Sequence, residues 1–212
     1  MNHLPIKRYL CLSGLLALLL SGCATTQTTS GGAVGVERGQ TMLLSSSEVN
    51  RSAATAYKTT IDSARSKGVL NRDSRQVERV RHIANRLIPA TATFRNDAPS
   101  WQWEVNVLTA KEVNAWCMPG GKMAVYSGLI EQLQATDDEL AAVMGHEIAH
   151  ALREHGRERI SEAYAQQAGM SLLAALTNID ARQAAILQTA TQLGMTLPHS
   201  RGQEAEADVM GL

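Results

Sequence analysis

The chain has 212 residues, and its 20 Lys and Arg side chains balance 20 Asp and Glu side chains. This length is typical of a single domain with a sizeable core, even after a leader is subtracted. Because the charge is balanced and no basic stretch is interleaved with aromatic residues, we expect no nucleic-acid partner.

The first 22 residues have the features of an export signal. Lys7 and Arg8 precede an apolar run from Tyr9 to Leu20, which is too short to span a bilayer as a permanent helix. The run ends in Leu-Ser-Gly-Cys, which resembles the bacterial lipobox, so we predict cleavage before Cys23 and lipid attachment to its sulfur. An ordinary secretory leader with an incidental cysteine, or an uncleaved anchor, is the alternative.

The residue after the predicted lipid site bears on localisation. Ala24 is not the aspartate that retains many enteric lipoproteins in the inner membrane, so the resemblance implies an outer-membrane lipid anchor facing the periplasm. Cys11 would leave with the leader and Cys23 would be modified, so Cys117 would be the remaining free thiol. We therefore expect no intramolecular disulfide, even in an oxidising compartment.

The composition divides the mature chain into a tether and one domain. Residues 23–46 are rich in Thr, Ser, Gly and Gln with almost nothing to bury, which predicts a flexible, lipid-anchored linker. Residues 47–212 then form the predicted domain. Helical spacing of apolar residues predicts helices over 47–66 and 72–88, and Pro89 is expected to stop the second one.

The next segment alternates between apolar and polar residues, as half-buried strands do. The pattern predicts strands over 101–109, 113–118 and 122–126, with the last two separated by Pro119-Gly120-Gly121. We expect these strands to form a small antiparallel sheet. Helices on both sides of it in the sequence give a mostly helical α+β fold.

Helices resume after the strands. Ser127 can cap a short helix through Gln134, and Thr136 with Glu139 forms a capping box for a long helix predicted over 137–160.

That long helix carries the motif His146-Glu147-Ile148-Ala149-His150. Two histidines four positions apart are separated by about 400° and about 6 Å of rise, so both imidazoles leave the same helix face and can bind one metal ion. Glu147 projects near that metal, where a carboxylate can take a proton from a metal-bound water. The pattern is that of a zinc peptidase. A helix with two surface histidines and a solvated glutamate is the alternative, but the apolar residues around the motif indicate a buried helix.

Several ordered motifs together resemble the HtpX and CAAX-prenyl-protease family of zinc peptidases, and in particular its soluble bacterial lipoprotein branch. The resemblance covers roughly Ser47 to the C-terminus. Its motifs are Asn114-Ala115-Trp116-Cys117-Met118-Pro119-Gly120-Gly121, Ser127-Gly128-Leu129, the two-histidine motif, His199-Ser200-Arg201, and Glu204-x-Glu206-Ala207-Asp208. The resemblance implies a zincin-like metallopeptidase domain of the gluzincin type, in which a glutamate is the third metal ligand.

Carried over residue by residue, the resemblance implies one Zn²⁺ ion per chain. His146, His150 and Glu204 would be its protein ligands, and Glu147 would activate the attacking water. Asp208 lies one helical turn after Glu204 on the same face and would act close to the catalytic centre.

The family resemblance also implies a substrate-binding edge strand. Asn114, Ala115 and Trp116, with Gly120 at the following turn, would pair with an extended peptide through main-chain hydrogen bonds. Such an edge would recognise unfolded chains with little sequence preference. A plain hairpin is the alternative.

Other polar residues near the motifs are given less specific roles. Helical geometry places Glu206 away from the metal face and His155 off the ligand face, where it is expected on the surface. Cys117 is expected to be a buried thiol rather than a redox switch or an inhibitory ligand. His199 and Arg201 match the family's run before the third ligand and would orient that ligand or stabilise an oxyanion.

Two functions are compatible with these features. The first is a zinc endopeptidase that hydrolyses unfolded or damaged envelope proteins, its substrates and partners, while the chain is held at the membrane by its N-terminal lipid. The second is a non-catalytic lipoprotein that holds outer-membrane proteins as a chaperone would. Relatives continue beyond the position of Leu212, so we expect a truncated C-terminus and a short ligand helix.

Overall fold

The computed structural model describes residues 25–31, 34–177 and 200–212; the leader with Cys23 and Ala24, and His199, lie outside these residues. The elements in chain order are β1 (Thr25–Thr26), β2 (Gln40–Thr41), α2 (Ser46–Ser66), α3 (Ser74–Ala90), η1 (Thr91–Thr93), η2 (Ala98–Ser100), β3 (Glu104–Leu108), β4 (Ala115–Met118), β5 (Lys122–Tyr126), α4 (Ser127–Gln132), α5 (Asp137–Leu152), α6 (His155–Thr177) and α8 (Arg201–Gly211). The mostly helical α+β class predicted from the sequence is confirmed. Pro89 lies inside α3, one residue before its end.

The three main strands form a mixed sheet in the order β3-β5-β4. β5 pairs parallel with β3, with Val107 opposite Val125, and antiparallel with β4, with Ala115 opposite Val125. The expectation of a purely antiparallel sheet is therefore corrected. β5 inserts between β3 and β4 instead of adding outside β4, and an alternating pattern predicts strands and their faces but not their order.

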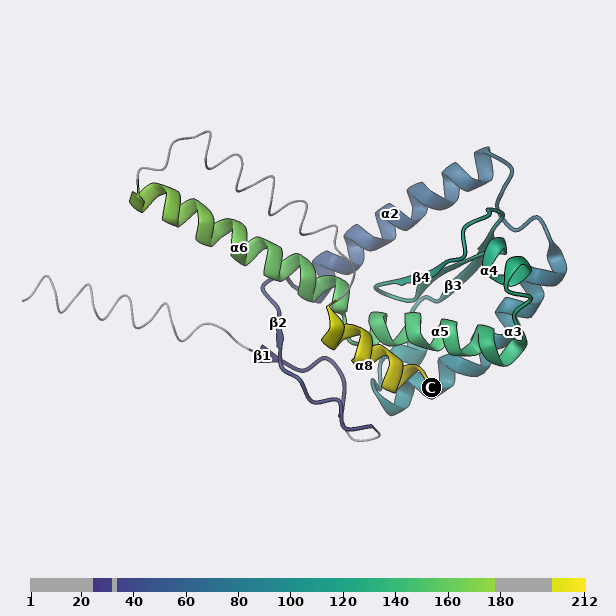
Figure 1. The fold of residues 1–212 in the computed structure, drawn as a ribbon, viewed down its shortest axis with the longest axis horizontal. Coiled ribbons are helices and arrows are strands. Elements are labelled where there is room, and N and C mark those ends of the chain that lie inside the picture. The colour runs from purple at the N-terminus through teal and green to yellow at the C-terminus, as the bar shows by residue number, and fades with distance from the viewer. Residues whose placement is uncertain (1–24, 32–33, 178–199) are drawn as a thin grey trace, which may run out of the picture.

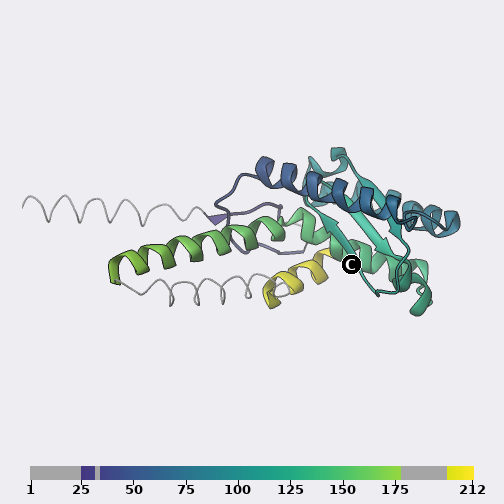
Figure 2. The same ribbon diagram turned by 90° about the horizontal axis from the view of Figure 1, so that it is seen from above.

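Helices cover both faces of this sheet (Figures 1 and 2). α2 packs on one face, where Tyr57 and Ile61 meet Trp116 and the buried Ala124. α3 and α5 pack on the other face, and α8 lies along α5 (Figure 1). This layering buries α5 between the sheet and α8, so its motif residues face a packed interior.

The long helix predicted over 137–160 is broken into α5 and α6. Glu154 has a left-handed backbone conformation (φ 51°) between the two helices. Such a conformation costs about 1–2 kcal/mol for a residue with a side chain. Hydrogen bonds from Arg95 (2.6 Å), Arg157 (2.7 Å) and Ser46 (3.1 Å) hold the Glu154 carboxylate and offset that cost.

The N-terminal segment, defined here as residues 26–31 and 34–45, packs against the domain, although its composition predicts a flexible tether. Gln40 is fully buried and donates a hydrogen bond to the Arg153 backbone oxygen (2.6 Å). Arg153, also fully buried, donates to the Arg38 backbone oxygen (2.9 Å) and to Thr29 Oγ1 (3.2 Å). Composition underestimated this segment because many of its contacts are hydrogen bonds, although Val36 joins the apolar core.

Candidate metal centre

α5 presents the two-histidine motif because both ends of the helix and one side of it are fixed. Thr136 and Glu139 form the predicted capping box at its N-terminus. On the side that faces α8, Gly145 lies directly against the Gly211 backbone, and a side chain at position 145 would collide with it. The missing side chain lets α8 approach α5 closely enough to bring Glu204 to the histidines.

His146, His150 and Glu204 converge on one point. Their ligand atoms all lie within 4.8 Å of one another. The two Nε2 atoms are 3.0 Å apart, and the Glu204 carboxylate oxygens lie 3.4 Å from His146 Nε2 and 3.5 Å from His150 Nε2. A tetrahedral zinc ion with ligand bonds near 2.0–2.1 Å separates its ligand atoms by about 3.3 Å. The donor set and its spacing therefore fit a metal ion of this kind.

Each ligand histidine also has a partner at its other ring nitrogen. Asp208 Oδ1 lies 2.9 Å from His146 Nδ1, and the Asp208 side chain is 68% exposed. His155 Nδ1 lies 2.8 Å from His150 Nδ1. Such partners fix the ring orientation and tautomer of metal-binding histidines. Asp208 thus reaches the site through His146.

Glu147 is half-buried beside the ligand cluster. The backbone N–H of Cys117 in β4 donates a hydrogen bond to its carboxylate, which links the motif helix to the sheet edge. Burial raises the pKa of Glu147 to about 7, a shift that His146 partly opposes. A carboxylate with such a pKa can both accept and release a proton near neutral pH.

β4 lies at the sheet edge next to α5, but the predicted substrate residues are not all on the same side. Tyr126 N–H donates to the Asn114 backbone oxygen, so Asn114 bonds inward to β5, and by the antiparallel alternation the backbone of Ala115 points outward. The Trp116 ring packs edge-on against Tyr57 on the α2 face, with ring centroids 6.0 Å apart. Gly120 lies in the following turn with φ 80°. The structure brings the β4 backbone, and not the Trp116 ring, toward the motif helix.

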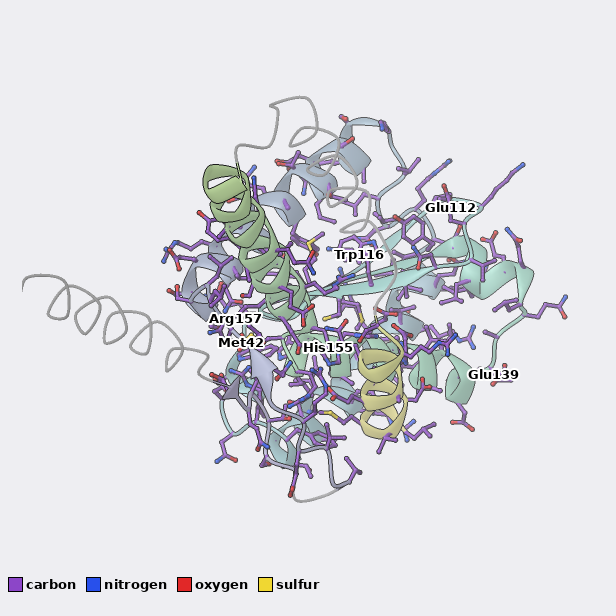
Figure 3. The ribbon with its side chains drawn as sticks, turned by 60° about the vertical axis from the view of Figure 1, so that its left-hand side comes forward. Met42, Glu112, Trp116, Glu139, His155 and Arg157 are labelled. Atoms are coloured by element: carbon purple, nitrogen blue, oxygen red, sulfur yellow. The ribbon has the colours of Figure 1, made fainter. Side chains whose placement is uncertain are left out.

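Several residues close to the site were missed or misplaced by the sequence analysis. His155, expected on the surface, is fully buried at the start of α6 (Figure 3). Glu206 faces away from the ligands, as expected, but is buried and lies 3.0 Å from His155 Nε2. A polar run with Arg153, His155 and Glu158 following an apolar helix was the available signal. Without knowledge of the break at Glu154, such a run is interpreted as the solvent-exposed end of the helix.

The other predicted residues have simpler surroundings. Cys117 is a free cysteine, and burial raises the pKa of its thiol well above the ordinary value, as expected of an unreactive thiol. Arg201 is exposed in the first turn of α8. His199 cannot be placed, since it lies outside the described residues.

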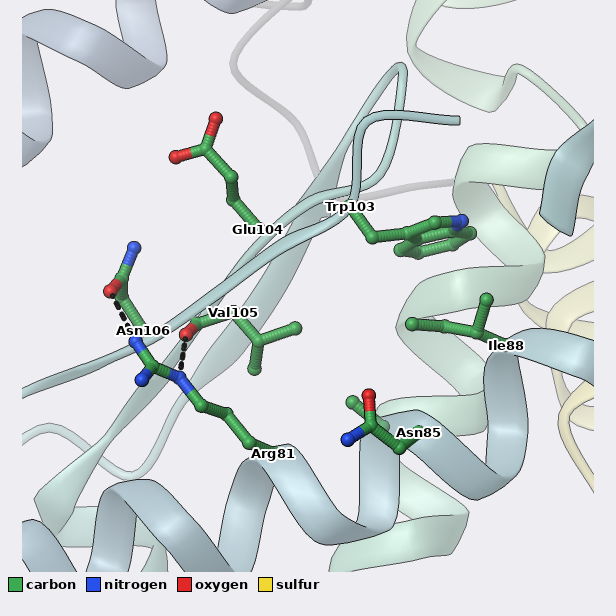
Figure 4. Close-up of a pocket in the computed structure, with 8 residues that line it drawn as sticks. Arg81, Asn85, Ile88, Trp103, Glu104, Val105 and Asn106 are labelled. Atoms are coloured by element: carbon green, nitrogen blue, oxygen red, sulfur yellow. Dashed lines mark hydrogen bonds between the residues drawn. The ribbon is translucent and has the colours of Figure 1, made fainter. Parts of the chain in front are cut away.

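A hollow of about 320 Å³ lies between α3 and β3, at the edge of the sheet opposite β4 (Figure 4). Ile88, Val105 and Trp103 line it, and Arg81 closes one end by donating to the Val105 backbone oxygen (3.1 Å). None of the predicted site residues lines this hollow. The metal centre and the hollow are therefore separate features.

Comparison with known proteins agrees with the geometry. The chain is 35% identical over 111 residues to the mitochondrial metalloendopeptidase OMA1 of Schizosaccharomyces pombe, covering 52% of this chain and 32% of OMA1. It is 27% identical over 206 residues to metalloprotease YcaL of Escherichia coli K12, covering 91% and 72% of the two chains. It is 30% identical over 156 residues to metalloprotease LoiP of the same organism, covering 74% and 57%.

The match to OMA1 thus spans about a third of that relative's length. The profile of Peptidase family M48 matches residues 74–212, which include α5, α8 and all three strands of the sheet. The matched part contains the whole His146, His150 and Glu204 cluster, and the chain belongs to peptidase family M48.

Proposed function

We propose that the chain is a zinc-dependent metalloendopeptidase that hydrolyses peptide bonds of unfolded or misfolded cell-envelope proteins. The observation that carries the proposal is the convergence of His146, His150 and Glu204, with the half-buried Glu147 beside them. Three protein ligands that leave one position open are typical of catalytic rather than structural zinc sites.

Different residues of the site would have different roles in hydrolysis. A zinc ion at this site would act as a Lewis acid and would lower the pKa of its bound water. Glu147 takes the proton from the attacking water at its carboxylate and passes it to the leaving amide nitrogen. Asp208 accepts the hydrogen bond from His146 Nδ1 and holds that ligand in orientation.

The substrate would bind along β4. β4 pairs with β5 along one edge, and an extended peptide would add as a further strand along its other edge. Strand pairing forms hydrogen bonds with the peptide backbone rather than with its side chains. Such binding favours unfolded substrates, because their backbone is accessible. The Cys117 N–H bond to Glu147 sets this edge close to the catalytic carboxylate.

We also propose that the chain is anchored by lipid at Cys23 to the outer membrane, facing the periplasm. The lipobox-like run and Ala24 support this placement. In residues 25–31, 34–177 and 200–212, no helix is both long and apolar enough to cross a membrane.

The test is cleavage of an unfolded protein by the purified chain. Glu147→Gln should reduce hydrolysis by at least about 100-fold while zinc binding is kept, because the metal ligands are untouched. Glu78→Gln, which makes the same change at an exposed position on α3, is the matched control and should cleave like wild type. Removing zinc with a chelator should abolish cleavage.

Binding of the unfolded protein without cleavage by wild-type, zinc-loaded protein would refute the proposed enzyme. That result would instead favour a chaperone-like lipoprotein that uses the same β4 edge.

A further inference from the structure

A buried line of polar side chains runs from the metal centre into the protein. His150, His155 and Glu206 follow one another at 2.8 Å (Nδ1 to Nδ1) and 3.0 Å (Nε2 to Oε2). His155 is fully buried, and His150 and Glu206 are 6% and 8% exposed. Figure 3 shows His155 at the base of α6, near α8. Because these side chains are shielded from bulk solvent, the surrounding protein groups decide each proton position.

The charges around Glu206 keep it ionised. Arg153 Nε donates to Glu206 Oε2 (2.9 Å), and Arg38 Nε donates to Oε1 (2.5 Å). Arg38 also pairs with Glu158 (2.5 Å), so two guanidinium groups face two carboxylates. Two cations thus already balance these two carboxylates, and burial disfavours a further positive charge on His155. His155 is therefore a neutral imidazole, with a proton on one nitrogen only.

Because the His155 ring is neutral, its contacts determine which ring nitrogens of His155 and His150 carry a proton. An ionised Glu206 can only accept, so His155 carries its proton on Nε2 and donates it to Glu206. His155 Nδ1 is then an acceptor and must receive the proton of His150 Nδ1. His150 Nε2, which faces Glu204 and His146, then carries its lone pair rather than a proton. That is the tautomer a metal ion requires.

We propose that His155 and Glu206 are positioning residues that hold His150 in its metal-binding tautomer and orientation before a metal arrives. The inference rests on the metal site of the proposed function and assigns no catalytic step to either residue. The two ligands therefore differ in their support. His146 has the exposed Asp208 as its partner, whereas the partner of His150 is the buried His155, which contacts Glu206, and Glu206 in turn pairs with two arginines.

The first experiment reads the tautomer directly. Metal-free wild-type protein with ¹⁵N-labelled histidine should show His150 protonated at Nδ1 in long-range ¹H–¹⁵N spectra at pH 7. His155→Phe, which keeps the ring volume but has no nitrogen, should lose this preference. His82→Phe, at an exposed position on α3, is the matched control and should leave the His150 signals unchanged.

The second experiment measures zinc affinity by competition with a chromophoric chelator. His155→Phe should weaken zinc binding by about 10- to 100-fold, as loss of such a partner does elsewhere. Glu206→Gln keeps an acceptor for His155 Nε2–H and should weaken it less than Glu206→Ala. His82→Phe should bind zinc like wild type.

The outcomes separate this inference from the proposed function. His150 protonated at Nε2 in wild type would overturn the inference even if His155→Phe fails to fold. Equal zinc affinity in folded His155→Phe and wild type would also overturn it, and both results leave the proposed hydrolysis standing. Tight zinc binding without peptide hydrolysis by wild type would overturn the proposed function and leave the inference in place.

Discussion

Acidification from pH 7 to pH 5 should destabilise the metal-free protein through His155. Burial, the largest cause, lowers the pKa of His155 from 6.5 to about 4, although its contact with Glu206 opposes the shift. In the unfolded chain the same imidazole takes up a proton below pH 6.5, whereas in the folded protein it stays neutral until about pH 4. The unfolded state therefore binds more protons between these values, and the stability falls as the pH falls.

The size of the stability loss follows from the difference between pH 5 and the pKa of His155 in the unfolded chain. At pH 5 the pH lies 1.5 units below the unfolded pKa of 6.5 and still above the folded pKa of about 4. Each unit is worth about 1.4 kcal/mol, so His155 should contribute about 2 kcal/mol to the loss of unfolding free energy between pH 7 and pH 5.

Urea unfolding followed by circular dichroism at both pH values, with a chelator present, measures this loss. His155→Phe has no imidazole at the position, so its stability should fall by about 2 kcal/mol less than that of wild type over the same interval. Comparing the two proteins cancels groups that titrate in both and do not contact His155. An equal fall in wild type and His155→Phe would refute the claim that His155 is buried as a neutral ring.

Three further perturbations test the surroundings of the metal centre. Arg38→Ala should lower the unfolding free energy by about 1–3 kcal/mol, because the buried partners of Arg38 lose a counter-charge, whereas Arg75→Ala at an exposed position should stay within about 0.5 kcal/mol of wild type in urea. Asp208→Asn should weaken zinc binding measurably by chelator competition, but less than the about 10- to 100-fold expected at His155, because its side chain is 68% exposed; an unchanged affinity would contradict its contact with His146. Gly145→Val should push α8 away from α5 and weaken zinc binding in the same assay, and normal affinity would show that this close contact is not needed.

The sequence predicted the parts of the site that lie within one helix or one short motif. The spacing of His146 and His150 fixes their common face through helix geometry alone, and the capping box at Thr136 predicted where that helix begins. Glu204 was assigned by family resemblance, and it lies beside the histidines in the structure. Local rules and a recognised motif were sufficient for these residues.

What the sequence could not predict depends on contacts between distant segments. The break at Glu154 is held by Arg95 and Ser46, which are far away in the chain, so the helical pattern alone continued through it. Once the helix breaks, His155 turns inward, and its burial depends on Glu206 from α8. The order of the strands also depends on contacts between distant segments, because the pattern within a strand does not indicate which strand pairs with it.

The packing of the N-terminal segment has a practical consequence for how the enzyme is produced. A truncated version designed to start at α2 would look reasonable from composition, because it discards only residues rich in Thr, Ser and Gly. It would also discard Gln40 and Arg38, and so expose the Arg153 backbone, leave Glu158 without its cation and leave Glu206 with Arg153 alone. Loss of activity in such a preparation would reflect the missing N-terminal segment rather than the metal site.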